Sequence, residues 1–133
     1  MDILRLNVLL LNEDPNLLKT MADCLIDQGF TVHMVHTKDE ALKALEHQTF
    51  NVLVTDLTMP ENDGISITKL LGDSMPIVML RGSDDERMVG DLDQFSCCFL
   101  DKADISARLA QASWKAYKRF KIDCQLTKDI VAA

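Results

Sequence analysis

The sequence predicts a single (βα)₅ domain of the α/β class, in which a doubly wound, five-stranded parallel sheet is covered by helices on both faces. Three observations predict it. Short runs of aliphatic and β-branched residues recur along the chain, the stretches between them have room for one amphipathic helix each, and 133 residues with 47% hydrophobic content suit one globular domain. The predicted strands are residues 7–11, 31–35, 51–55, 76–80 and 97–100.

The first two helices carry start signals. Asp14 followed by Pro15 is an N-cap residue with proline at the first helical position, and Gly29 ends the apolar repeat that follows. Thr37 and Glu40 have the spacing of a capping box, which predicts a second helix immediately afterwards.

The later helices are marked by periodicity. A third helix is expected from about Ile65 to Leu71, ended by Gly72, and a fourth from about Asp84 to Phe95, which Gly90 weakens. The fifth begins near residue 104. Its sheet-facing stripe, at helical spacing, is Ile105, Leu109, Ala112, Ala116 and Phe120, and Trp114 is expected on the opposite side.

Charge and hydropathy limit the classes of function. The net charge of −7 argues against direct nucleic-acid binding by this domain, because nucleic acids are polyanions. No apolar run is long enough to cross a membrane and no signal peptide is evident, so we expect a cytoplasmic protein with no membrane partner. The four cysteines lack zinc-site spacing and are expected to be reduced thiols. Residues 105–121 form a basic segment that contains no acid.

Charged side chains follow several of the predicted strands. Glu13 and Asp14 follow the first strand, Asp56 the third and Lys102 the fifth. In an open parallel sheet, chemistry is expected at the carboxyl ends of the strands. Clustered carboxylates with hydrated surroundings suit Mg²⁺, although Asp14 is better explained as the cap of the first helix.

The segment from Asp56 to Gly64, DLTMPENDG, resembles the D-x-x-M-P-x-x-D-G signature of response-regulator receiver domains. The resemblance covers residues 7 to about 121, and Lys102 falls at the position of the family's lysine. It implies a flavodoxin-like strand order of 2-1-3-4-5. Met59-Pro60 and Asp63-Gly64 are interpreted as structural, forming a rigid turn and a permissive backbone position.

The resemblance also implies a function in two-component signal transduction. Asp56 would accept a phosphoryl group from a sensor histidine kinase or a phosphotransfer protein, and the protein would not be an enzyme. Mg²⁺ would be held by Glu13, Asp56 and the backbone carbonyl of Thr58, with Asn12 orienting a metal-bound water. Lys102 would bind a phosphoryl oxygen.

Three positions depart from the family pattern. Asn12 replaces an acid, which is expected to weaken Mg²⁺ binding. Arg81 replaces the Ser or Thr of the hydroxyl switch, and either binds phosphate or pairs with Asp56 or another nearby acid. Ala103 replaces the proline after Lys102, which predicts a trans peptide bond.

The expected output surface comprises the fourth helix, the fifth strand and the fifth helix. A homodimer or an effector protein would bind there, with Trp114 in a basic field and the acids of residues 84–93 as pairing partners. Phe99 occupies the family's aromatic switch position or is ordinary core. Residues 1–121 are assigned to the receiver domain and residues 122–133 to a helical extension, linker or tail.

Two other functions stay open from the residues. A degenerate receiver-like module could act through protein interactions independently of phosphorylation, which Asn12 and Arg81 favour. A flavin carrier or small α/β enzyme is disfavoured, because Asn12-Glu13-Asp14 does not form a phosphate-binding loop.

Overall fold

The computed structural model describes residues 5–82 and 97–132, with side chains as far as residue 125. One parallel sheet has the strand order β2-β1-β3-β4-β5. This confirms the predicted fold class and strand order. The strands are β1 (Asn7–Leu11), β2 (Thr31–Val35), β3 (Val52–Asp56), β4 (Ile77–Arg81) and β5 (Cys97–Asp101). The α-helices are α1 (Pro15–Asp27), α2 (Lys38–His47), α3 (Asp63–Leu71) and α5 (Ile105–Ala132).

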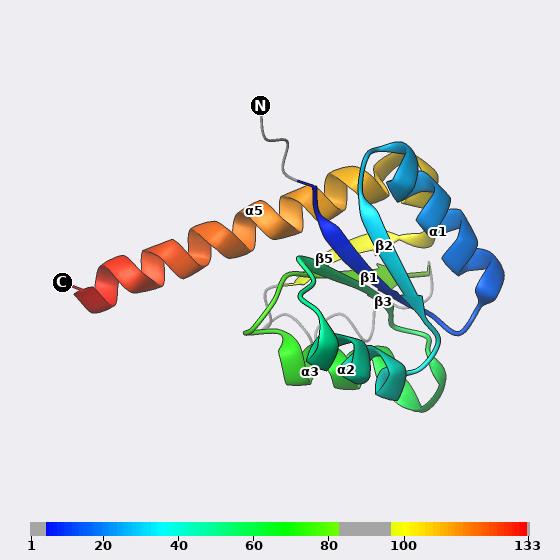
Figure 1. Ribbon diagram of the computed structural model, residues 1–133, viewed down its shortest axis with the longest axis horizontal. Helices are drawn as coiled ribbons and strands as arrows, with labels where there is room; N and C mark the ends of the chain where they lie inside the picture. The colour runs from blue at the N-terminus through cyan, green and yellow to red at the C-terminus, as the bar shows by residue number, and fades with distance from the viewer. Residues whose placement is uncertain (1–4, 83–96, 133) are drawn as a thin grey trace.

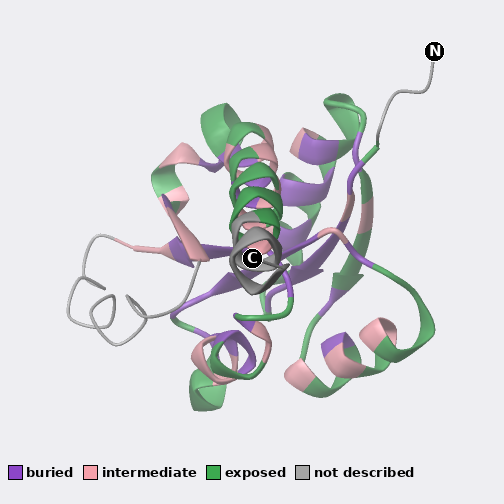
Figure 2. Cartoon of the chain, turned by 90° about the vertical axis from the view of Figure 1, so that its left-hand side faces the viewer, coloured by how far each residue is buried: buried purple, intermediate pink, exposed green. Residues whose placement is uncertain are grey.

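The sheet separates two layers of helices. Helices α1 and α5 cover one face, and α2 and α3 cover the other (Figure 1). Alternate residues of the central strands enter the two cores. Val8, Leu10 and Val54 pack towards α1 and α5, whereas Leu9 and Leu53 pack towards α2 and α3. The three central strands, β1, β3 and β4, are therefore apolar on both sides and buried in the interior, whereas β2 and β5 at the edges are more exposed (Figure 2).

Both predicted N-caps are present. The Asp14 side chain accepts hydrogen bonds from the backbone N–H groups of Asn16 and Leu17. The Thr37 hydroxyl oxygen accepts one from the N–H of Glu40, at 3.1 Å. These bonds satisfy helix donors that have no partner within the helix, and they fix where each helix begins after its strand.

A short 3-10 helix, Pro60–Asn62, connects β3 to α3, so the third helix begins two residues before the expected Ile65. Glu61 and Asn62 take the left-handed conformation, with φ of 58° and 57°. The interpretation of Gly64 as a permissive backbone position is wrong, because its φ is not positive. A Cβ at Gly64 would overlap the backbone carbonyl oxygen of Asp56, so glycine is required because α3 approaches the end of β3 closely.

Helix α5 continues as one helix to Ala132 and extends beyond the sheet (Figure 1). Ile105, Leu109 and Ala116 of its predicted stripe are buried, and Ala112 and Phe120 are half-buried. The Lys102–Ala103 peptide bond is trans, as predicted, and Lys102–Asp104 form a 3-10 helix before α5.

The prediction of an outward-facing Trp114 is wrong. Its ring packs edge-on against Phe30, with centroids 5.9 Å apart, and against Tyr117, at 6.1 Å. Trp114 is half-buried and belongs to the margin of the core between α1 and α5, because it lies on the side of α5 that faces α1.

The predicted helix at residues 84–95, and the acids on it, lie outside the described residues. Within the described part of the chain, no helix has the length and apolar character needed to cross a membrane.

Candidate active site at the carboxyl edge of the sheet

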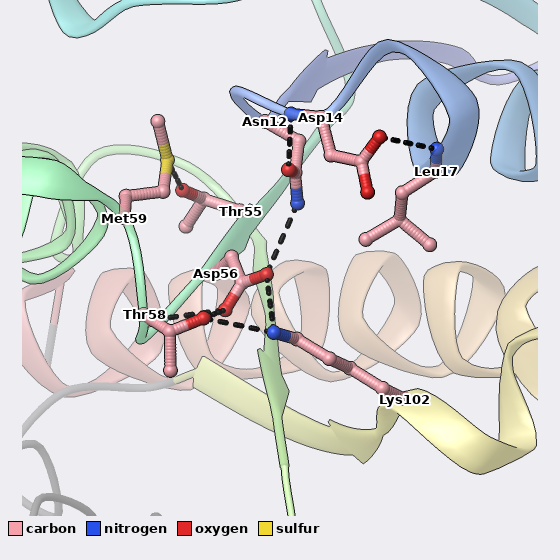
Figure 3. Close-up of polar contacts among 8 residues, drawn as sticks. All are labelled: Asn12, Asp14, Leu17, Thr55, Asp56, Thr58, Met59 and Lys102. Carbon is pink, nitrogen blue, oxygen red and sulfur yellow. Dashed lines mark hydrogen bonds and ion pairs between the residues drawn. The ribbon is translucent and has the colours of Figure 1, made fainter.

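Asp56 ends β3 and is 3% exposed. Its two carboxylate oxygens face different groups (Figure 3). Oδ1 accepts hydrogen bonds from the Thr58 backbone N–H at 2.9 Å and from the Thr58 hydroxyl at 2.8 Å. Oδ2 lies 2.9 Å from the Lys102 ammonium and accepts a hydrogen bond from the Asn12 amide at 3.1 Å. The buried charge is therefore paired and fully hydrogen-bonded, as its burial requires.

Lys102 connects the two halves of this arrangement. Its Nζ donates to the Thr58 hydroxyl oxygen at 2.8 Å as well as contacting Asp56. The Lys102 side chain is 34% exposed, whereas that of Asp56 is only 4% exposed. Lysine thus covers the carboxylate from the solvent side, on a long stem that can move without disturbing the core.

Asn12 lies at the end of β1 and is 2% exposed. Its Oδ1 accepts a hydrogen bond from the Asp14 backbone N–H at 2.9 Å. That bond determines the orientation of the amide, because a flipped amide would oppose one donor to another and an oxygen to the Asp56 carboxylate. Asn12 therefore presents an N–H group to Asp56, where an acid would present an oxygen.

Arg81, at the end of β4, pairs with Asp101 and not with Asp56. Its Nε lies 2.7 Å from Oδ1 of Asp101, and its guanidinium lies 5.8 Å from the centre of the Phe99 ring. Arg81 and Asp101 are register partners on β4 and β5. Of the two predicted alternatives, the structure has the ion pair with an acid, and that acid is Asp101.

Comparisons with known proteins agree with this geometry. The model of the response regulator receiver domain matches residues 8–112. The chain belongs to the response-regulator receiver family. It is 29% identical over 130 residues to the response regulator MprA of Mycobacterium ulcerans, with 94% of this chain and 56% of that protein covered. It is 32% identical over 87 residues to the transcriptional regulatory protein CpxR of Escherichia coli, with 62% and 37% covered.

Solved receiver domains share the fold. The receiver domain of Francisella response regulator 1452 superimposes with a TM-score of 0.75 at 24% identity, over 86% of this chain and 98% of that one. The chain spans about half the length of MprA and less of CpxR, so it corresponds to the receiver part of such regulators.

Of the charged residues that the sequence placed together at one edge, Asp56 and Lys102 are in contact, and Asn12 joins them from the end of β1. Glu13 is exposed, and Asp14 serves as the cap of α1. The resemblance implied a role only for the backbone carbonyl of Thr58, whereas in the structure the Thr58 hydroxyl also belongs to the site. The available signal was its position two residues after Asp56, where a short hydroxyl side chain can turn back onto the carboxylate.

Receiver domains typically bind Mg²⁺, and the donor chemistry at this site is suitable but poor in charge. If Asp56, Glu13 and the Thr58 carbonyl held the ion, they would offer hard oxygen ligands, of which two are carboxylates. Asn12 contributes a donor N–H and no negative charge. Among the described side chains, no group of three or more His, Cys, Asp or Glu is placed to hold a metal ion. A site of this composition would be expected to bind Mg²⁺ more weakly than a site with a further acid.

Proposed function

We propose that this receiver domain accepts a phosphoryl group on Asp56 from the phosphohistidine of a sensor kinase or phosphotransfer protein. One observation carries the proposal: Thr58 holds Oδ1 of Asp56 with two hydrogen bonds, while Oδ2 pairs with the partly exposed Lys102. A carboxylate fixed at one oxygen presents the other as an oriented nucleophile.

The transfer breaks the bond between phosphorus and the donor histidine nitrogen and forms a bond between phosphorus and an Asp56 oxygen. The product is an acyl phosphate, and the donor histidine leaves as a neutral imidazole, because its other ring nitrogen already carries a proton. Lys102 moves from the carboxylate to a phosphoryl oxygen and offsets its charge. Its reach to both Asp56 and Thr58 makes that displacement short.

A divalent cation completes the charge balance in this proposal. Glu13, Asp56 and the Thr58 carbonyl would hold Mg²⁺, which would supply positive charge beside the phosphoryl oxygens. Asn12 holds the Asp56 carboxylate in place and is suited to orient a metal-bound water.

The relay step is proposed on the surface of β5 and α5; the predicted fourth helix, which the resemblance adds to this surface, lies outside the described residues. An effector protein or a second copy would bind there in the cytoplasm, and the domain would act as a signalling module and not as an enzyme. Arg81 and Phe99 lie at the β4–β5 end of this surface, in contact with each other. We also propose that this surface passes the signal to the effector part of any longer regulator that contains this domain.

Intact-mass spectrometry after incubation with acetyl phosphate tests the acceptor. We expect one phosphoryl adduct in the presence of Mg²⁺, much less with EDTA, and none in Asp56→Asn. Glu61→Gln removes an exposed carboxylate of the same segment and is the matched control, which should still be labelled. An adduct that persists in Asp56→Asn would contradict Asp56 as the acceptor.

The Arg81–Asp101 ion pair favours a second candidate, a receiver that works through its surface without phosphorylation. Arg81 occupies the position of the hydroxyl switch, and its side chain is paired with Asp101 instead of Asp56. Under this alternative, acetyl phosphate gives no adduct, and Asp56→Asn leaves binding to the cellular partner unchanged.

A further inference from the structure

A groove of about 470 Å³ lies between β5 and the outer side of α5. Residues 97–100 form its floor, and Arg108, Gln111, Ala112, Lys115 and Arg119 form its wall. The groove is separate from the Asp56 cluster, because neither Asp56 nor Lys102 contributes to its lining.

The wall of the groove is strongly basic. Arg108, Lys115 and Arg119 are spaced seven and four residues apart, which places all three on one side of α5. All three are exposed, and no Asp or Glu is among the described residues that line the groove. By contrast, the two described ion pairs of the protein lie at the carboxyl edge of the sheet. The groove therefore offers three cations without an acidic partner in its described lining.

The floor of the groove favours an extended ligand. β5 is an end strand of the described sheet, and Cys98 and Phe99 are half-buried along it. The distance from Arg108 to Arg119 along α5 is about 16 Å, which equals roughly five residues of extended chain. A segment lying along β5 would bring alternate side chains against these cations.

We propose that this groove binds an extended acidic segment of a partner protein. The inference rests on the proposed relay function for its role, since it names the class of partner, but the binding itself requires no phosphoryl group. Charge complementarity would orient the partner and accelerate its association.

Other occupants are less compatible with the charges. A nucleic acid would contact a domain whose net charge is −7, which repels an extended polyanion outside the groove. A symmetric dimer centred on the groove would bring the three cations of each copy towards those of the other, and it is distinguished below by a test of self-association.

Fluorescence anisotropy tests the proposal with the full chain and a labelled peptide of about ten residues in which Glu alternates with Val. We expect saturable binding, about tenfold weaker in the double variant Arg108→Gln, Lys115→Gln. The matched control is Lys118→Gln, Lys121→Gln, which removes the same charge from α5 outside the groove lining. It should change affinity by less than about threefold. Circular dichroism verifies that both variants fold.

Asp56→Asn separates this proposal from the proposed function, since it should abolish labelling by acetyl phosphate and leave peptide binding intact. Equal weakening in the two double variants would overturn the groove as a site, because it would show general attraction to a basic helix. Tighter binding of an oligonucleotide of the same charge would show that the groove binds nucleic acid and not an acidic peptide. If the protein binds no peptide but self-associates, and the groove variant abolishes the self-association, the occupant of the groove is a second copy of this chain.

Discussion

Arg81 Nε and Asp101 Oδ1 lie 2.7 Å apart across the β4–β5 pair, and the Arg81 guanidinium also lies over the Phe99 ring. The Arg81 and Asp101 side chains are 35% and 51% exposed. The pair is a register match at the ends of two parallel strands, so the backbone itself holds the two side chains together. It links the position of the usual hydroxyl switch to an aromatic residue of the proposed output surface.

The energy of this pair should be small because water screens it. We expect a coupling free energy between Arg81→Ala and Asp101→Ala of less than about 1 kcal/mol. A double-mutant cycle by urea denaturation measures it, and 1 M salt should reduce it further. A coupling above about 2 kcal/mol, insensitive to salt, would mean that the pair is shielded from solvent and acts as a structural lock.

Asn12→Asp should strengthen Mg²⁺ binding by about tenfold or more, because it places a third carboxylate at the cluster where the amide N–H now faces Asp56. Isothermal titration calorimetry measures the affinity. Without Mg²⁺ the variant should be less stable than wild type, since two carboxylates then approach each other, and Mg²⁺ should restore its melting temperature.

Asn12→Ala is the control for this substitution. It removes the same hydrogen bonds to Asp56 and Asp14 without adding charge, so it should lose stability and show no rescue by Mg²⁺. Equal Mg²⁺ affinities in the Asp and Ala variants would show that residue 12 does not limit metal binding.

Gly64→Ala should destabilise the protein by about 1–3 kcal/mol and disturb the Asp56 site, since the new Cβ overlaps the Asp56 carbonyl and lies 3.1 Å from Thr55 Oγ1. The comparison is Gly29→Ala, where the Cβ would meet open space and only the φ of 90° is unfavourable. Urea denaturation measures both. A larger loss at Gly29 than at Gly64 would contradict the close approach of α3 to β3.

Removal of residues 122–133 should leave the receiver folded, with its free energy of unfolding changed by less than about 1 kcal/mol. Ile122 is 60% exposed, and the extension lies beyond the sheet (Figure 1). Removal of residues 116–133 is the contrast, because it deletes the buried Ala116 and the core-margin Tyr117. That truncation should cost several kcal/mol. Similar losses of unfolding free energy in the two truncations would contradict a domain boundary after residue 121.

Much of the fold is encoded locally. The apolar runs define the strands because a parallel sheet buried on both faces needs continuous aliphatic sequence. Asp14 and Thr37 define helix starts because their side chains bond to the nearby backbone. These features act over a few residues, so spacing and residue type suffice to predict them. The contact between Asp56 and Lys102 also followed from the sequence, since parallel strands end at one edge, whereas the cluster contains Asn12 and not the expected Glu13.

The tertiary structure decided what these residues do there. Only the folded structure shows that Trp114 lies against Phe30 and that Arg81 pairs with Asp101 and not with Asp56. It also shows that the Thr58 hydroxyl contacts both Lys102 and Asp56. Each outcome depends on a few ångströms between side chains from separate elements, which periodicity cannot resolve. The sequence by itself determined which segments form the strands and at which edge of the sheet the charged side chains meet. The pairing of those charges was decided by register and distance in the folded chain, because electrostatic and hydrogen-bonding preferences act only at contact.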